Sequence, residues 1–69
     1  MIIGDRIRYY RKQRGYTQRE FAKKLCISTQ AVSKWENGHT FPDLPTFIRI
    51  AELLYVSLDN LAGTEYLRR

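Results

Sequence analysis

Apolar residues recur every three or four positions along most of the chain, which is the spacing of amphipathic helices. Residues 4–14 form the first such segment, in which Ile7 and Tyr10 share one face. Gly15 then ends it, because glycine readily adopts the left-handed conformation that commonly follows a helix. No stretch alternates in the manner of a β-strand. The pattern therefore predicts an all-α protein.

Residues 17–37 contain two short helices joined by a tight turn. Thr17 and Glu20 have the spacing of a capping box, which marks the start of the first helix. Ser28 is a good N-cap for the second helix, which ends at Asn37 and Gly38. The residues at inward spacing are Phe21, Ala22 and Leu25 in the first helix and Ala31, Val32 and Trp35 in the second.

The C-terminal half predicts two more helices. Asp43 can cap a helix that carries Pro45 in its first turn and continues to about Tyr55. This segment is the most apolar of the chain, so we expect it at the centre of the core. Ser57 caps a short helix over residues 58–62. We therefore expect a five-helix bundle, with residues 1–69 as a single domain and residues 64–69 as a frayed tail or a dimer contact.

Two helices joined by a short turn, the second with short polar side chains outward, form the helix-turn-helix arrangement that reads DNA. The run over residues 18–38 resembles the phage repressor and Cro-like helix-turn-helix family, which includes the xenobiotic-response-element-type transcriptional regulators. The residues that carry the resemblance are Gln18, Ala22, Gln30-Ala31-Val32-Ser33 and Trp35-Glu36-Asn37-Gly38. The likeness covers residues 4–62 and implies the lambda-repressor-like fold.

The outward side chains of the second helix of the motif are candidates for base contacts. Gln30 can bond adenine with two hydrogen bonds, and Lys34 can reach the O6 and N7 atoms of guanine. Thr29 and Ser33 can donate, accept or touch a thymine methyl group. Surface polarity alone would also explain these four residues, so the hypothesis rests on the motif that surrounds them.

A second set of residues is expected to hold the DNA backbone. The resemblance implies that Gln18, which opens the motif, and Asn37, which ends it, bind phosphates on either side of the groove. A helix N-terminus also presents free amides to an anion at Gln18. The other expected phosphate contacts are Arg19, Ser28, His39 and Thr40. Members of the family often carry a basic residue near Phe41, where this chain has an apolar one.

The resemblance also implies an ion pair between Arg11, late in the first helix, and Glu36, late in the third. Trp35 is expected in the core, and Cys26 is expected to serve packing at a turn position where glycine is common. Cys26 and His39 lack a third orienting group in the sequence and do not indicate a catalytic site. We therefore expect no enzyme activity, no metal and no cofactor.

Charge is unevenly distributed along the chain, whose net charge is +5. Residues 1–35 hold nine Lys or Arg against two acids, a net +7, and residues 36–69 hold three against five, a net −2. The basic half contains the motif, as expected of a nucleic-acid binder. The alternative is a solvated basic face with no partner.

These observations predict a cytoplasmic, sequence-specific DNA-binding regulator, most simply a repressor, that docks residues 28–37 in the major groove. We expect it to bind as a homodimer on an inverted repeat, with Tyr66 and Leu67 as a seam between copies. Two alternatives stay open: a protein-interaction module such as an antitoxin or adaptor, and nonspecific architectural binding. A large exposed apolar patch would favour the interaction module, and a basic helix face favours DNA.

Overall fold

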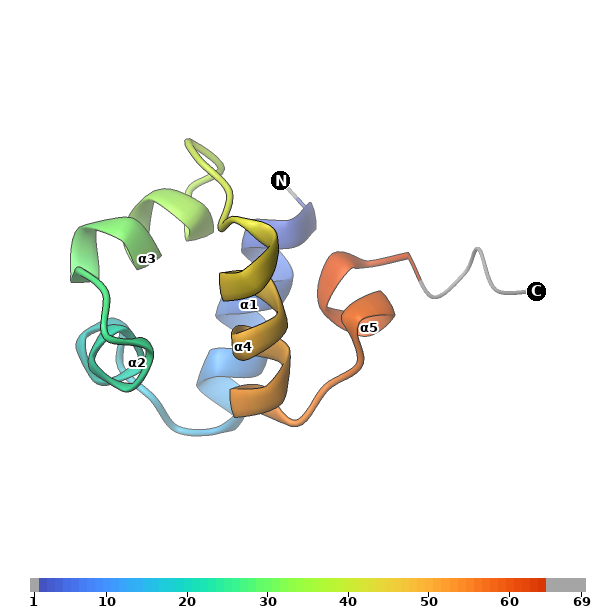
Figure 1. The fold of residues 1–69 in the computed structure, drawn as a ribbon, viewed down its shortest axis with the longest axis horizontal. Helices are drawn as coiled ribbons and strands as arrows, with labels where there is room; N and C mark the ends of the chain where they lie inside the picture. The colour runs from blue at the N-terminus through green and yellow to red at the C-terminus, as the bar shows by residue number, and fades with distance from the viewer. Residues whose placement is uncertain (1, 65–69) are drawn as a thin grey trace.

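Five helices make up the part of the chain that the computed structural model describes, residues 2–64 (Figure 1). They are α1 (Ile2–Gln13), α2 (Gln18–Leu25), α3 (Thr29–Glu36), α4 (Leu44–Leu54) and α5 (Leu58–Ala62). In Figure 1, α2 and α3 lie on one side of α1 and α4, and α5 lies on the other. The predicted all-α five-helix fold is confirmed.

The predicted N-caps are confirmed at four helices. At α2 the Glu20 amide donates to the Thr17 hydroxyl at 3.0 Å, and the Thr17 amide donates to the Glu20 carboxylate at 2.9 Å. The bond from the Thr17 amide lowers the pKa of Glu20. The side chains of Ser28, Asp43 and Ser57 accept in the same way at the starts of α3, α4 and α5. Each cap satisfies an amide that the helix itself leaves unpaired.

The core is built from all the helices. The residue at inward spacing in α1, Ile7, is fully buried. Trp35 is buried with the rest, as expected, and Tyr16 packs against Phe21 with 6.2 Å between ring centroids. The remaining buried apolar residues are Phe21, Ala22, Leu25, Val32, Ile50, Ala51, Leu54 and Leu61. Helix α3 packs against both α1 and α2, so the core fixes the outward face of α3 relative to α2.

Several apolar residues that fall at helical spacing on α4 and α5 are exposed. Leu44 and Ile48, on α4, are 66% and 39% exposed, and Leu58 on α5 is 43% exposed. On α4, Ile50, Ala51 and Leu54 are buried and Phe47 and Leu53 are partly buried against the core, so the buried face is narrower than the apolar pattern of the helix. Tyr66 and Leu67, predicted as the seam of a dimer, lie outside the described residues.

Helix α1 begins at Ile2, so its predicted start at Gly4 is wrong. Gly4 is an interior residue, buried where α1 crosses the end of α3. A Cβ on Gly4 would lie 2.2 Å from the carbonyl oxygen of Trp35 and 3.2 Å from that of Glu36. Glycine is present here because the two backbones approach closely, and not because the helix starts here.

Gly4→Ala is expected to destabilise the protein by about 1 to 3 kcal/mol, although alanine favours a helix by about 1 kcal/mol over glycine. The clash is with backbone atoms of α3, which cannot rotate away as a side chain would. Urea unfolding compares the variant with Gly15→Ala as a control, where the space is open and only the left-handed backbone is strained. A Gly4→Ala variant as stable as the parent would show that α1 and α3 can separate without cost.

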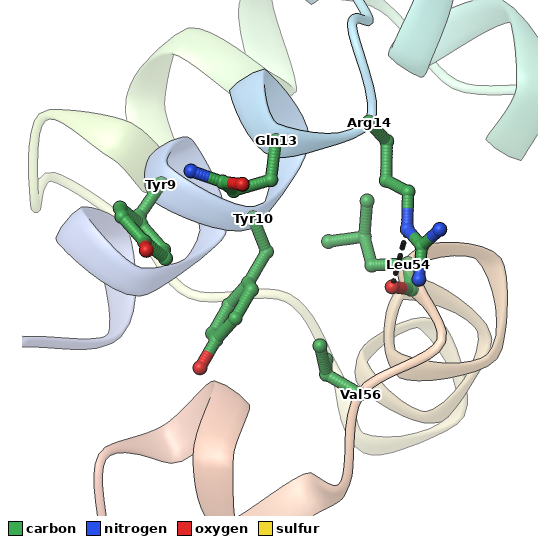
Figure 2. A pocket seen from close by; sticks show the side chains of 6 residues that line it. All are labelled: Tyr9, Tyr10, Gln13, Arg14, Leu54 and Val56. Atoms are coloured by element: carbon green, nitrogen blue, oxygen red, sulfur yellow. Dashed lines mark hydrogen bonds between the residues drawn. The ribbon is translucent and has the colours of Figure 1, made fainter.

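Arg14 connects the C-terminal ends of α1 and α4 (Figure 2). Its Nε donates to the Leu54 carbonyl at 3.0 Å, and its guanidinium lies over the Tyr55 ring, 4.7 Å from the centroid. Tyr55 ends α4 in the left-handed conformation, with φ 58°. A cation at a helix C-terminus is favoured by the helix dipole.

Within residues 2–64, no helix is long and apolar enough to cross a membrane.

Candidate nucleic-acid interface

The turn between α2 and α3 is tight. Cys26 takes the left-handed conformation, φ 59°, and its amide donates to the Ala22 and Lys23 carbonyls. The Ile27 amide also donates to the Ala22 carbonyl at 3.0 Å, which completes the helix end. The expectation that Cys26 serves packing is wrong, because the left-handed residue that ends α2 directs its side chain to solvent. Cys26 thus takes the conformation that glycine commonly takes at this turn position.

The outward face of α3 carries the candidate base-reading residues. Gln30 and Lys34 are exposed, and they lie four residues apart on one side of the helix. Thr29 and Ser33, also four apart, are half-buried beside them. Each residue presents a hydrogen-bonding group, and Lys34 adds a positive charge. The opposite side of α3 is fixed in the core by Val32 and Trp35.

One group of candidate phosphate contacts lies at the N-terminal ends of α2 and α3. Gln18 is the first residue of α2, and its Nε2 donates to Glu36 Oε1 at 3.0 Å. Arg19 is exposed next to it. Ser28 is exposed at the start of α3, where its hydroxyl accepts from the Ala31 amide at 3.1 Å. The first amides of a helix favour an anion.

The second group lies at the C-terminal end of α3. Asn37 is the exposed C-cap, and its Nδ2 donates to the Ser33 hydroxyl at 3.3 Å. His39 and Thr40 follow in an exposed loop, and both amides donate to the Lys34 carbonyl. The candidate phosphate contacts therefore lie at the N-terminal ends of α2 and α3 and at the C-terminal end of α3, and the bond from Gln18 to Glu36 brings the start of α2 close to Asn37. Phe41, next along, is exposed and apolar.

A buried carboxylate connects the helices behind this face. Arg11 and Glu36 are only 6% and 3% exposed. Arg11 Nε donates to Glu36 Oε2 at 2.7 Å, and Arg11 Nη2 donates to Glu36 Oε1 at 3.0 Å. The same guanidinium donates to the Tyr16 carbonyl through Nη1. This geometry uses both carboxylate oxygens, so the ion pair fixes the end of α3 against α1.

Two further side chains bond Glu36, and the sequence reading missed this role for both. They are Gln18, expected only at a phosphate, and Arg8, whose Nε donates to Glu36 Oε1 at 3.3 Å. Arg8 Nη2 also donates to the Glu36 carbonyl at 3.3 Å and to Asn37 Oδ1 at 3.5 Å. Arg8 lies one helical turn before Arg11, on the same face of α1. This spacing could have indicated that both arginines bond Glu36.

Burial raises the pKa of Glu36, because it penalises the charged form. The hydrogen bonds from Arg11, Gln18 and Arg8, together with the positive charge of Arg11, outweigh burial and hold the pKa of Glu36 below its ordinary value. The carboxylate is therefore charged at neutral pH and able to accept from all its donors.

The rest of the described surface contains few features of another kind of site. Among residues 2–64, no group of three or more His, Cys, Asp or Glu is placed to hold a metal ion. One hollow of about 350 Å³ is shown in Figure 2, and its charged lining residue, Arg14, already bonds Leu54. The lining residues are Tyr9, Tyr10, Gln13, Arg14, Leu54 and Val56.

Comparison with known proteins places the chain in a family. The helix-turn-helix family matches residues 7–61, which include α2, the turn and α3. The chain therefore belongs to the phage repressor and Cro-like helix-turn-helix family. This is a family of DNA-binding transcriptional regulators and not of enzymes.

Three relatives illustrate the similarity. The chain is 42% identical over 64 residues to an uncharacterized transcriptional regulator, YazB of Bacillus subtilis (strain 168), with 93% of each chain covered. It is 37% identical over 65 residues to the regulator ImmR of the same organism, covering 94% of this chain and 51% of ImmR. It is 42% identical over 57 residues to the regulator DicA of Escherichia coli (strain K12), covering 83% of this chain and 42% of DicA. The chain thus spans about half the length of ImmR and less of DicA.

Proposed function

We propose that this protein binds duplex DNA in a sequence-specific manner, with α3 in the major groove and the two groups of phosphate contacts on the flanking backbone. The observation that carries the proposal is the outward face of α3. That face is polar and basic, and the opposite face of α3 is fixed by the buried Arg11–Glu36 ion pair and by the core. A rigid helix with donors and acceptors on its solvent side matches what the major groove presents.

The proposed base contacts are Thr29, Gln30, Ser33 and Lys34. Gln30 is the best placed of these, because it is exposed on the first turn of α3 and its amide can donate and accept at an adenine. Lys34 lies one turn further on and can reach a guanine. In helix-turn-helix proteins the first turns of the recognition helix contact base edges, which supports Thr29 and Gln30 in particular.

The proposed phosphate contacts are Gln18, Arg19, Ser28, Asn37, His39 and Thr40. Such contacts set the register of the protein on the duplex and carry affinity, but they do not read sequence directly. The net charge of +7 over residues 1–35 supports backbone binding by this half of the chain.

Alanine substitutions separate the two roles. Gln30→Ala and Lys34→Ala are each expected to lose about 1 to 3 kcal/mol of discrimination at particular base pairs. Gln18→Ala is expected to weaken binding to every duplex alike. Fluorescence anisotropy with a preferred and a random duplex measures both effects, and Arg49→Ala, exposed on α4, is the control. If Gln30→Ala weakened both duplexes equally, Gln30 would not read bases.

We propose that the protein regulates transcription, most simply as a repressor, because a protein without an activating partner can block a promoter by occupying it. We propose that it acts in the cytoplasm, in the same compartment as the DNA that it binds. An antitoxin or adaptor that used the bundle only to hold a partner protein, and not to read DNA, would show no sequence preference on duplex DNA. An architectural protein would bind, yet unrelated competitor DNA would displace it as well as any specific site.

We further propose that two copies occupy an inverted repeat. Tyr66 and Leu67 remain the proposed seam. A second candidate is the exposed apolar strip formed by Phe41, Leu44 and Ile48. Residues 39–48 contain one formal charge, on Asp43, so two chains of net charge +5 would repel least where these segments face each other.

A further inference from the structure

The two ends of the motif pose different electrostatic problems for a bound phosphate. At the start of α2 the helix dipole and the free amides favour an anion. At the end of α3 the dipole is reversed, and the last carbonyls oppose an anion. Asn37, the proposed contact there, is neutral. A positive charge close to this end of α3 would therefore favour a phosphate there.

Arg8 is placed to supply that charge. Its Nη2 donates to the Glu36 carbonyl at 3.3 Å, which neutralises the last carbonyl of α3, and to Asn37 Oδ1 at 3.5 Å. The Asn37 amide is thereby oriented, with its Nδ2 directed toward Ser33. The Arg8 side chain stays 41% exposed, whereas that of Arg11 is 8% exposed. Within residues 2–64, the bonds from Arg8 to α3 use Nε and Nη2, which leaves Nη1 available.

The local structure of α1 explains how Arg8 reaches this position. Gly4, Arg8 and Arg11 lie at positions i, i+4 and i+7 and share one face of the helix. Gly4 lets α1 approach the end of α3, so the guanidinium one turn later meets Glu36 and Asn37 directly. Arg6, on the same helix, instead donates to the Asn60 carbonyl of α5 at 3.1 Å. In Figure 1, α3 and α5 lie on opposite sides of α1.

We propose that Arg8 is a further phosphate-binding residue at the C-terminal end of α3, where it provides the charge for the phosphate that Asn37 contacts and orients the Asn37 amide. This proposal rests on the proposed DNA-binding function and deepens it. Arg8 therefore adds affinity for any duplex and does not change which bases are preferred.

The test is the salt dependence of binding to a labelled duplex of random sequence. Each phosphate contact adds about 0.9 to the slope of log K against log salt concentration on B-form DNA. Arg8→Gln is expected to reduce that slope by about one per bound chain, and Arg8→Lys to restore most of it. Arg6→Gln is the matched control, since it removes a cation and an interhelix bond on the side facing α5 and is expected to leave the slope unchanged.

The outcomes are distinguishable. If Arg8→Gln lowers the melting temperature while the slope stays at the parent value, Arg8 is only structural and the inference is wrong. The same conclusion follows if Arg8→Lys behaves as Arg8→Gln does. If the parent protein binds duplex DNA specifically, the proposed function stands in either case. If the parent binds no duplex at all, both proposals are overturned.

Discussion

Glu36→Ala is expected to lower the free energy of unfolding by about 3 to 5 kcal/mol, since removal of one partner of a buried ion pair strands the other charge. Arg11 would remain buried and would keep its hydrogen bond to the Tyr16 carbonyl. It would lose the carboxylate that accepts hydrogen bonds from its Nε and Nη2. Gln18 and Arg8 would lose an acceptor as well. Glu36 thus connects α1, α2 and α3 through its bonds with Arg8, Arg11 and Gln18.

Urea unfolding at neutral pH measures the loss. Glu52→Ala, an exposed carboxylate on α4, is the matched control and is expected to change the free energy of unfolding by no more than about 0.5 kcal/mol. Because the pKa of Glu36 is lowered by folding, its contribution is present above the pKa of the unfolded chain and is lost as pH falls through the folded pKa. Glu36→Gln should therefore weaken the acid dependence of stability. An Arg11→Met or Glu36→Ala variant with an unchanged midpoint would contradict this account.

Scrambling one half of the operator is expected to reduce affinity by about 4 kcal/mol or more, roughly a thousandfold. One recognition helix reads about four base pairs, and each mismatch costs about 1 to 3 kcal/mol. A two-fold dimer places its recognition helices about 34 Å apart, which corresponds to half-sites about 10 base pairs apart. Binding to full, half-scrambled and respaced duplexes gives the loss, and analytical ultracentrifugation of the saturated complex gives the number of chains.

The seam is tested on the same duplexes. Deletion of residues 65–69 removes the proposed Tyr66 and Leu67 contact, and Leu44→Ser changes the exposed strip that the described residues offer. The variant that loses cooperative binding to the full site, but keeps the parent affinity for the half-site, identifies which segment forms the dimer contact. Equal affinity for the half-site and the full site, or one chain per full site at saturation, would refute the dimer.

The sequence predicted what depends on local chemistry. Thr17, Ser28, Asp43 and Ser57 start helices because their side chains accept from amides three residues later, and that preference needs no tertiary structure. Trp35 was assigned to the core from its spacing in α3, and it is buried. The resemblance implied that Arg11 and Glu36 meet, and the structure contains that ion pair.

The errors concern long-range geometry. In the sequence alone, Gly4 suggests the start of a helix. The close crossing of α1 with α3 shows why a glycine lies inside the helix. Leu44 and Leu58 have the spacing of core residues, but periodicity cannot show how wide a face the neighbouring helices cover. Arg8 lies 28 residues before Glu36, and a basic residue on an amphipathic helix does not indicate its acceptor. The base and phosphate contacts themselves depend on DNA and remain proposals.

Selection of bound duplexes from a random-sequence pool tests whether α3 reads base sequence. The protein is expected to enrich one motif, an inverted repeat with a short conserved half-site. Gln30→Ala, carried through the same selection, should lose preference at one or two positions of each half-site and keep the rest. If the parent protein enriched no motif and its binding depended only on duplex length, α3 would not read base sequence.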